Sequence, residues 1–158
     1  VPTRTSMDIG PDVLERLVGD ERFVGVKESS YNIPFVMEKI RRVGDKIPFF
    51  SGNDDTVIPM MALGAQGVIS VVSNLLPKTV ADMAKGWLAG EHDAALKTQL
   101  RLMPLICALF AEVSPIPCKA GMEMMGLCGG ELRLPLVPIA ECNRAKLREA
   151  LVALGVQV

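Results

Sequence analysis

The sequence predicts an α/β fold, part of a parallel β/α barrel that is followed by a bundle of helices. In the first half of the 158 residues, three apolar, β-rich runs alternate with helical patterns, and no further strand is expected after Lys78. The strands start about 20 to 25 residues apart and read as continuous apolar runs, which is typical of βα units on a parallel sheet. Three such strands need partners to finish a covered sheet, and an eight-stranded barrel supplies them.

The individual elements follow from local signals. We expect strands at residues 23–27, 47–51 and 67–72. Prolines in first turns and glycines after last turns mark the helices beside them, at residues 11–18, 34–43 and 54–63. Helical apolar spacing predicts four further helices, at residues 80–89, 92–110, 117–127 and 139–154. We therefore expect two domains, with the barrel part at residues 1–90 and a three-helix domain at residues 91–158.

Composition and charge exclude several classes of function. Hydrophobic residues make up 49% of the chain, as in a globular protein. The net charge is −1 with no basic run, so we expect no nucleic-acid partner. The uncharged stretch 56–77 is interrupted by prolines and glycines, and a membrane span needs about 20 consecutive apolar residues. We therefore expect no membrane partner and, because no signal peptide is visible, a cytoplasmic protein.

The cysteines carry no metal-binding pattern. Their spacing contains no C-x-x-C pair, and His92 is the only histidine. We expect all four to be small buried thiols in a reducing cytoplasm, and we expect no metal site. The four are Cys107, Cys118, Cys128 and Cys142.

The lysine at the end of the first apolar run is the strongest candidate for chemistry. Side chains alternate along a strand, so Gly25 and Lys27 share one face while Val24 and Val26 share the other, which helices cover in a barrel. Lys27 then points inward at the C-terminal end of its strand, where barrel enzymes place their active sites, with space above Gly25. Burial lowers the pKa of a lysine, and a neutral amine attacks a ketone to form a Schiff base. The alternative is a solvated lysine paired with Glu28.

Seven short motifs in a fixed order give the chain a wider resemblance. They are V-P-T-R-T at 1–5, G-V-K-E at 25–28, S-G-N-D-D at 51–55, G-V-I-S-V at 67–71, S-P-I-P-C-K at 114–119, M-G-L at 125–127 and L-R-L-P-L at 132–136. Together they resemble the dihydrodipicolinate synthase family of pyruvate-dependent class I aldolases, which includes N-acetylneuraminate lyase. The resemblance covers essentially the whole chain. It implies strands 6–8 of a (β/α)8 TIM barrel followed by a C-terminal helical domain, and a lyase of lysine and diaminopimelate biosynthesis.

The resemblance also implies roles for individual residues. Lys27 matches the Schiff-base lysine that condenses with pyruvate, so no cofactor is implied beyond that covalent adduct. Arg4 matches the arginine that holds the carboxylate of aspartate semialdehyde, which a guanidinium fork suits. Ile69 matches the residue whose main-chain carbonyl lies against the keto acid, and as a side chain it suits the barrel core. Gly52 matches a glycine that lets a ligand approach at the mouth of the site.

Three more residues complete the implied substrate-binding set: Asn53, Asp54 and Ser114. Ser114 stands where the family usually has asparagine, and Asn53 stands where aspartate is common. Both positions lie where the polar end of the second substrate is expected. An aldolase or dehydratase of the same superfamily that acts on a sugar acid therefore stays open as an alternative, although Arg4 argues against it.

The family's chains are nearly twice as long as this one, and the resemblance begins in the loop after strand five. The tyrosine expected just before Val1, the threonines that hold the pyruvate carboxylate and the lysine feedback site all belong to the first half. We therefore expect the N-terminal half of the barrel as a partner and a homo-oligomer such as a homotetramer. We expect no activity from this chain alone, because a solvated lysine is a poor nucleophile at neutral pH. Two alternatives remain: a non-catalytic folding or assembly fragment, and an unrelated α/β binding domain.

Overall fold

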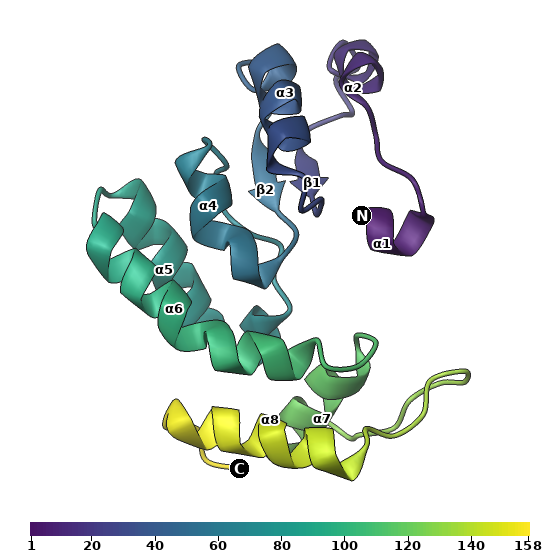
Figure 1. Cartoon of the computed structure of the whole chain (residues 1–158), viewed down its shortest axis with the longest axis vertical. Coiled ribbons are helices and arrows are strands. Elements are labelled where there is room, and N and C mark those ends of the chain that lie inside the picture. Colours follow the sequence, from purple (N-terminus) through teal and green to yellow (C-terminus); the bar gives the residue numbers. More distant parts are fainter. The chain divides into compact units, whose positions relative to one another are not determined.

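The computed structural model describes all residues of the chain, 1–158, and they form two compact units. The first unit contains residues 1–70 and 84–95, and the second contains residues 71–83 and 96–158. Figure 1 shows their elements in chain order. The expected division into domains at residue 90 concerns the longer barrel and stays a prediction.

The first unit alternates strands and helices. In chain order it contains α1 (Pro2–Thr5), α2 (Pro11–Leu17), β1 (Val26–Glu28), α3 (Ile33–Val43), β2 (Phe49–Ser51), the 3-10 turn η1 (Asp54–Thr56) and α4 (Val57–Ala62). The two strands pair in parallel, with Lys27 opposite Phe50. A βα crossover between parallel neighbours is the unit from which α/β barrels are built, so this part of the prediction is confirmed.

The third expected strand is shorter than predicted. Val68 forms an isolated parallel bridge with Ser51, and Ile69 N donates to the carbonyl oxygen of Ser51 at 2.8 Å. The chain then turns into the 3-10 turn η2 (Val72–Asn74) instead of staying extended to residue 72. The order of the three segments, 26–28, 49–51 and 67–69, is nevertheless that of three consecutive parallel strands.

One face of this small sheet carries the core of the first unit. Val26 and Phe49 lie side by side on that face and are buried with residues of α2, α3 and α4, namely Leu14, Val36, Val43 and Met60. The first turn of α3 is capped by Asn32, because Oδ1 of Asn32 accepts a hydrogen bond from Phe35 N at 3.2 Å. Full burial of one such aliphatic side chain contributes about 1.5 to 3 kcal/mol. The opposite face of the sheet, which carries Lys27, is not covered by these helices.

Two expectations about the start of the first strand are wrong. Val24 is 78% exposed and does not pack under helices, because the strand begins only at Val26. The space above Gly25 is not open either. A Cβ at Gly25 would lie 3.3 Å from Cε2 of Phe50, so the Phe50 ring fills that space from the neighbouring strand.

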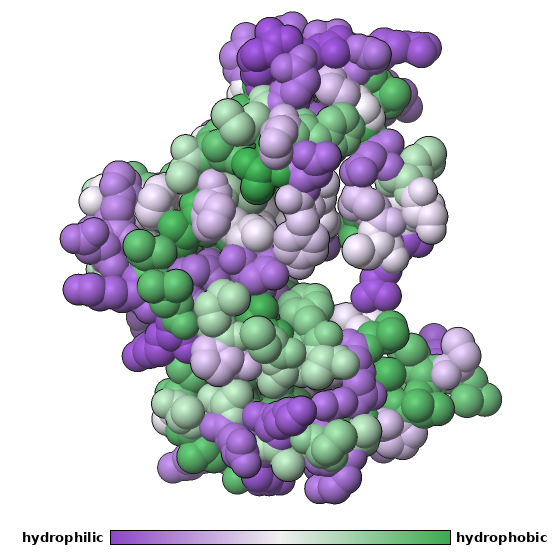
Figure 2. Space-filling model, viewed as in Figure 1, coloured by the Kyte–Doolittle hydropathy of each residue, from purple (hydrophilic) through white to green (hydrophobic).

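The second unit is helical. It contains η2, α7 (Ile116–Met124), α8 (Glu141–Ala153) and parts of α5 (Pro77–Leu88) and α6 (His92–Leu109). Its largest fully buried side chains are leucines of α6 and α8, namely Leu102, Leu105, Leu109, Leu147 and Leu151. The expected helix 117–127 ends at Met124, before Gly126 takes a φ of 70°. Hydrophobic side chains gather on the projecting loop after α7, at the lower right of Figure 2, where Leu134 is 89% exposed.

Two general findings bear on function. No helix combines the length and the apolar character that crossing a membrane requires. No group of three or more His, Cys, Asp or Glu side chains is placed to hold a metal ion. The expectation of four buried thiols is wrong, because only Cys118 is buried. Cys107, Cys128 and Cys142 are exposed, and none of the four forms a disulfide bond.

Candidate functional site

Lys27 is the middle residue of β1, and its two neighbours point the other way. Val26 and Glu28 are buried under the helices, while Lys27 is exposed on the face that it shares with Phe50. The alternation therefore places Lys27 on the inner face, as the sequence predicts. The lysine is not enclosed by the residues of this chain.

Gly52 is in close contact with Lys27. A Cβ at Gly52 would lie 2.8 Å from Cε of Lys27 and 1.9 Å from Oγ of Ser29, so a larger residue would require both side chains to move. Gly52 N also donates to the carbonyl oxygen of Glu28 at 2.7 Å, which fixes this position beside β1. The sequence predicts a glycine of close approach at residue 52, and the groups that approach it in the structure are the Ser29 hydroxyl and the stem of Lys27.

Ser29 is a site residue that the sequence analysis missed. It is 3% exposed, and its Oγ has no hydrogen-bond partner in the structure. Leaving a buried hydroxyl without a partner costs about 1 to 3 kcal/mol. Strand alternation could have revealed it, because Ser29 follows Lys27 by two residues and so lies on the same face.

Asn53 and Asp54 both have partners within the protein. Nδ2 of Asn53 donates to the main-chain carbonyl of Ser29 at 3.1 Å, and the Asn53 amide N–H donates to Oγ of Ser51 at 3.3 Å. Asp54 is 4% exposed and accepts a hydrogen bond from the hydroxyl of Ser70. The contact of Asn53 with Ser29 joins the end of β2 to the end of β1, and that of Asp54 with Ser70 joins it to the third segment. That either side chain also binds a substrate stays a prediction.

A second contact joins the same two loops. The hydroxyl of Tyr31, in the loop after β1, donates to Oδ2 of Asp55 at 3.2 Å. Partial burial raises the pKa of Tyr31, and the negative charge of Asp55 raises it further. The raised pKa means that the phenol stays protonated, and able to donate to Asp55, to a higher pH than a free tyrosine.

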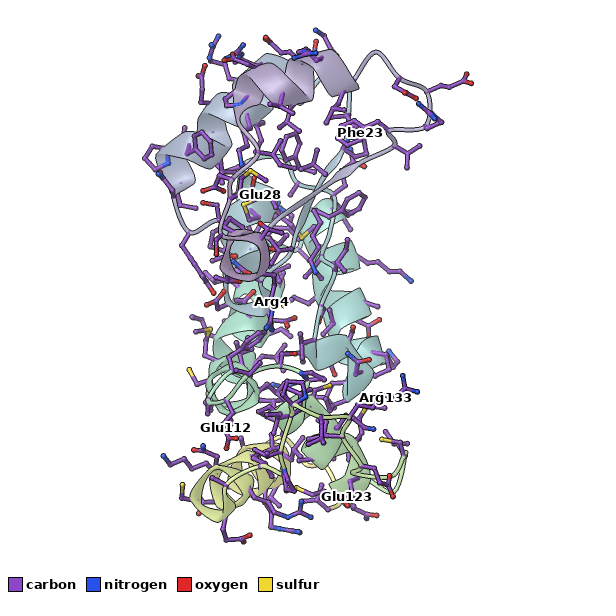
Figure 3. The ribbon with its side chains drawn as sticks, turned by 90° about the vertical axis from the view of Figure 1, so that its right-hand side faces the viewer. Arg4, Phe23, Glu28, Glu112, Glu123 and Arg133 are labelled. Carbon is purple, nitrogen blue, oxygen red and sulfur yellow. The ribbon has the colours of Figure 1, made fainter.

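Ile69 and Arg4 lie in the same unit as Lys27. The parallel register places Ile69 beside Gly52 on the inner face, where its side chain is 50% exposed and not part of a core. Arg4 is exposed on α1 (Figure 3), and the segment that follows α1 lines a small cavity together with residues of β1. A small cavity of about 30 Å³ between that segment and β1 is lined by Asp8, Lys27 and Glu28, among others.

Ser114 belongs to the second unit. It is half-buried in the loop before α7, and its place relative to Lys27 stays a prediction. The site that the structure brings together therefore consists of Lys27, Gly52, Asn53, Asp54 and Ile69, with Ser29 added.

A buried ion pair lies directly behind the lysine strand. Oε2 of Glu28 accepts from Nζ of Lys39 at 2.6 Å, and the two residues are 4% and 2% exposed. The alternative in which Lys27 pairs with Glu28 is thus wrong, because Glu28 faces α3. The sequence carries a signal for this pair: Lys39 falls on the apolar stripe of α3 with Val36 and Val43, where a charge needs a buried partner.

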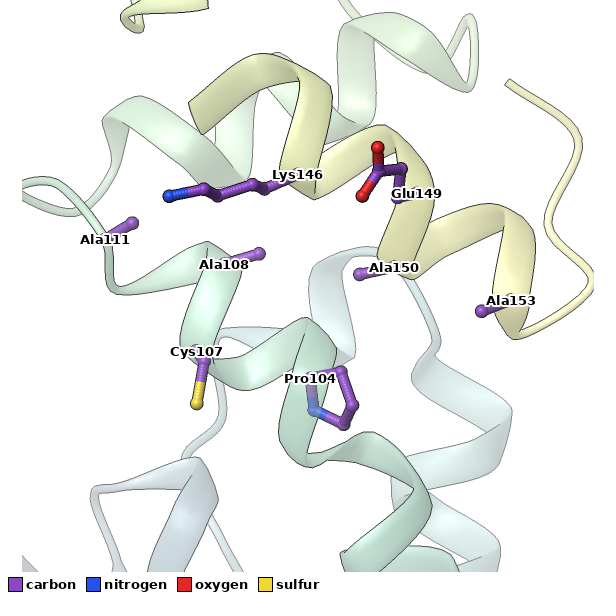
Figure 4. Close-up of a pocket in the computed structure, with 8 residues that line it drawn as sticks. All are labelled: Pro104, Cys107, Ala108, Ala111, Lys146, Glu149, Ala150 and Ala153. Atoms are coloured by element: carbon purple, nitrogen blue, oxygen red, sulfur yellow. The ribbon is translucent and has the colours of Figure 1, made fainter. Parts of the chain in front are cut away.

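A separate groove lies in the second unit, between α6 and α8 (Figure 4). It encloses about 500 Å³ and is lined mainly by small side chains, with Lys146 and Glu149 at its edge. None of the predicted site residues lines it.

The chain matches one family model and many known proteins. The model described as the dihydrodipicolinate synthetase family matches residues 1–154. The 4-hydroxy-tetrahydrodipicolinate synthase of Caldicellulosiruptor bescii is 42% identical over 158 residues, which is 100% of this chain and 53% of that protein. The enzyme of the same name from an Anaeromyxobacter species is 40% identical over 159 residues, with 54% of that protein covered. The chain thus spans about half the length of the curated relatives it matches.

Solved structures agree with these matches. The dihydrodipicolinate synthase of Aquifex aeolicus superposes with a TM-score of 0.96 at 37% identity, covering 100% of this chain and 54% of that one. The chloride-inhibited enzyme of Acinetobacter baumannii, complexed with pyruvate, superposes with a TM-score of 0.92 at 35% identity, covering 99% of this chain and 54% of that one.

Proposed function

The chain belongs to the dihydrodipicolinate synthetase family, and on this premise we propose that it supplies the Schiff-base lysine for condensing pyruvate with L-aspartate 4-semialdehyde. Its fold is the C-terminal part of a (β/α)8 barrel followed by a helical domain. The reaction is the one named by its curated relatives, which belongs to lysine and diaminopimelate biosynthesis. Membership of this family supports the class of enzyme, a class I aldolase-type lyase. The argument for the site rests on the residues of this chain.

In the proposed reaction, the neutral amine of Lys27 attacks the keto carbon of pyruvate. Water leaves and an imine joins Nζ to that carbon. Loss of a proton from the methyl group gives an enamine, whose terminal carbon attacks the aldehyde carbon of the second substrate. The amino group of that substrate then displaces Nζ, which closes the ring and frees Lys27. No cofactor takes part, because the imine on Lys27 accepts the electron pair that the methyl C–H bond leaves, and the enamine results.

The observation that carries this proposal is the contact between Gly52 and Lys27. Lys27 lies on the inner face of β1, one residue before that strand ends, and the absence of a side chain at Gly52 leaves the room that its stem occupies. Active sites of β/α barrels lie at the carboxyl ends of the strands. A lysine at this end, with a glycine just after the next strand kept free for it, is an arrangement that a purely structural lysine does not need.

Arg4 supports aspartate semialdehyde as the second substrate. Its guanidinium group suits the carboxylate of that substrate, and the segment after α1 lies against β1 beside Lys27. Asn53 and Ser114 are the positions that weaken this choice, because both differ from the residues common in the family. We propose that Asn53 acts at the site through Ser29, whose carbonyl it holds, rather than only through the substrate.

The rest of the barrel is proposed as the necessary partner. In this chain Lys27 is exposed, and Ile69, which lies beside Gly52 on the inner face, is half-exposed. An open parallel sheet leaves unpaired main-chain groups at its edges, and a solvated lysine stays protonated at neutral pH. We propose that an N-terminal half closes this face, that the complete barrel forms a homo-oligomer, and that the chain alone does not turn over.

Borohydride reduction in the presence of pyruvate tests the proposal. The sample is a complete barrel in which this chain follows the N-terminal half of the Caldicellulosiruptor bescii relative, with the chain alone beside it. We expect a reduced pyruvate adduct on Lys27 in the complete barrel, identified by peptide mapping, and none in a Lys27→Arg variant. A complete, folded barrel without an adduct on Lys27 contradicts the proposal.

A substrate panel with the same barrel addresses the second substrate. Turnover of aspartate semialdehyde that falls sharply in Arg4→Gln supports the assignment. If the barrel turns over a sugar acid instead, at a rate that Arg4→Gln leaves unchanged, the sugar-acid aldolase replaces the proposed synthase. An adduct without turnover of either class supports a non-catalytic role for the fragment.

A further inference from the structure

The buried pair behind β1 has more contacts than a simple ion pair requires. Oε2 of Glu28 accepts from Nζ of Lys39 at 2.6 Å, while Oε1 of Glu28 accepts from the amide N–H of Ser30 at 2.7 Å. Both oxygens of Glu28 are thus held, one by helix α3 and one by the loop that leaves β1. Because Glu28 directly follows Lys27, its fixed direction also fixes the direction in which Lys27 leaves the strand.

Lys39 contacts a third segment as well. Its Nζ lies 4.0 Å from Oδ1 of Asp8, in the segment that connects α1 to α2, and 4.3 Å from the centre of the Phe35 ring. The side chain of Lys39 is 3% exposed, so these contacts replace water almost completely. One buried ammonium group therefore joins α3, the end of β1 and the segment that follows Arg4.

We infer that Lys39 is a positioning residue, which acts through Glu28 to aim Lys27 and through Asp8 to hold the Arg4 segment beside it. The inference rests on the proposed function, since it concerns the lysine that this function uses. A buried ion pair is weak evidence for stability, because desolvation of both charges offsets their attraction. Its value here is geometric: a shift of about 1 Å at a reacting group can slow a reaction about 100-fold.

Three variants separate positioning from stability. Lys39→Met removes the ammonium group and keeps the length of the stem. The double variant Lys39→Met with Glu28→Gln removes both charges, so that no unpaired buried charge remains. Val36→Ala is the matched control, because it weakens the same buried stripe of α3 one turn earlier without touching Glu28.

The first measurement is hydrogen exchange of two main-chain amides in the 158-residue chain itself. Ser30 N donates to the Glu28 side chain, and Gly52 N donates to the Glu28 carbonyl. We expect both amides to exchange about tenfold faster in Lys39→Met and in the double variant, but not in Val36→Ala when the three are compared at equal stability. Wild-type exchange at both amides in the double variant overturns the inference.

The second measurement is the rate of pyruvate trapping on Lys27 in the complete barrel. We expect Lys39→Met to slow trapping at saturating pyruvate by between about tenfold and about 100-fold. The double variant should recover the thermal midpoint but not the rate, and Val36→Ala should lower the midpoint and keep the rate. A rate that follows the thermal midpoint in all three variants means that the pair is only structural.

The two measurements also separate the two proposals. If the wild-type barrel traps no pyruvate, the proposed function fails, and the exchange of Ser30 and Gly52 still decides whether Lys39 holds the end of β1. If trapping occurs but neither the exchange nor the rate responds to Lys39, the function stands and the positioning role is refuted.

Discussion

Asn53 donates a hydrogen bond from Nδ2 to the main-chain carbonyl of Ser29 at 3.1 Å, and this contact joins the end of β2 to the end of β1. A carboxylate could not make it, because it has no proton to donate. The asparagine at residue 53, where aspartate is common in the family that the chain resembles, is thus explained by a contact inside this protein.

Replacing that asparagine with aspartate should weaken the fold. In Asn53→Asp the carbonyl of Ser29 loses its donor and faces a negative charge instead, so we expect the free energy of unfolding to fall by about 1 to 3 kcal/mol. Urea unfolding of the chain measures this. The matched control is Asn32→Asp, since Asn32 accepts at the start of α3 and a carboxylate accepts equally well there. Equal stability of the two variants contradicts the role given to Asn53.

A methyl group at residue 52 should displace the lysine. Gly52→Ala places a Cβ at 1.9 Å from Oγ of Ser29 and 2.8 Å from Cε of Lys27, and overpacking of this kind costs about 1 to 3 kcal/mol. We expect lower stability in urea and no trapping of pyruvate in the complete barrel.

A double variant separates the loss of stability from the loss of pyruvate trapping. Adding Ser29→Ala removes the more severe clash and leaves the clash with Lys27. Stability should therefore return in large part, while trapping stays absent. If the double variant traps pyruvate at the wild-type rate, residue 52 does not act on Lys27.

The single tyrosine allows a direct reading of one pKa. Burial and the charge of Asp55 raise the pKa of Tyr31 above its ordinary value of 10.0. A group whose pKa is raised by folding adds stability that is complete below its unfolded pKa and is lost as the pH rises through its folded pKa. The stability linked to Tyr31 is therefore present at neutral pH and disappears above about pH 10.

Ultraviolet absorbance of the ionised phenol measures this shift without interference from a second tyrosine. We expect a midpoint above that of the urea-unfolded chain, and a midpoint closer to the unfolded value in Asp55→Asn, which keeps the partial burial but removes the charge. Identical midpoints for the folded and unfolded chain contradict the contact between Tyr31 and Asp55.

The thiols should divide into two classes. Cys107, Cys128 and Cys142 are exposed and Cys118 is buried, so we expect three thiols to react quickly with a coloured disulfide reagent and the fourth only on unfolding. The Cys118→Ser variant should keep the fast phase and lose the slow one. A slow phase that persists in this variant places the buried thiol elsewhere.

Much of the fold could be predicted from the chain because its signals are local. Proline in first turns, glycine after last turns and apolar spacing mark nearly every helix, and the parallel order of three strand segments follows from their separation. The residues at which the strands end were less predictable. The third segment forms a single bridge at Val68 and is helical by Val71, since the length of a strand depends on the neighbours that pair with it.

The candidate site was likewise predictable in part from the sequence. Alternation along one strand determines that Lys27 and Ser29 face away from Val26 and Glu28, and this needs no partner. That the Phe50 ring fills the space above Gly25 could not be read from either strand alone, because it depends on the register between them.

By itself, the sequence determined the family, the order of the βα units and the lysine that carries the proposed chemistry, because each depends on short motifs and local periodicity. Only the tertiary structure decided which charges are paired and which groups lie against the lysine. Glu28 pairs with Lys39, eleven residues away, rather than with its neighbour Lys27, and Gly52 reaches Lys27 from the adjacent strand. Contacts of this kind depend on where helices and strands pack, and packing is a property of the folded chain as a whole.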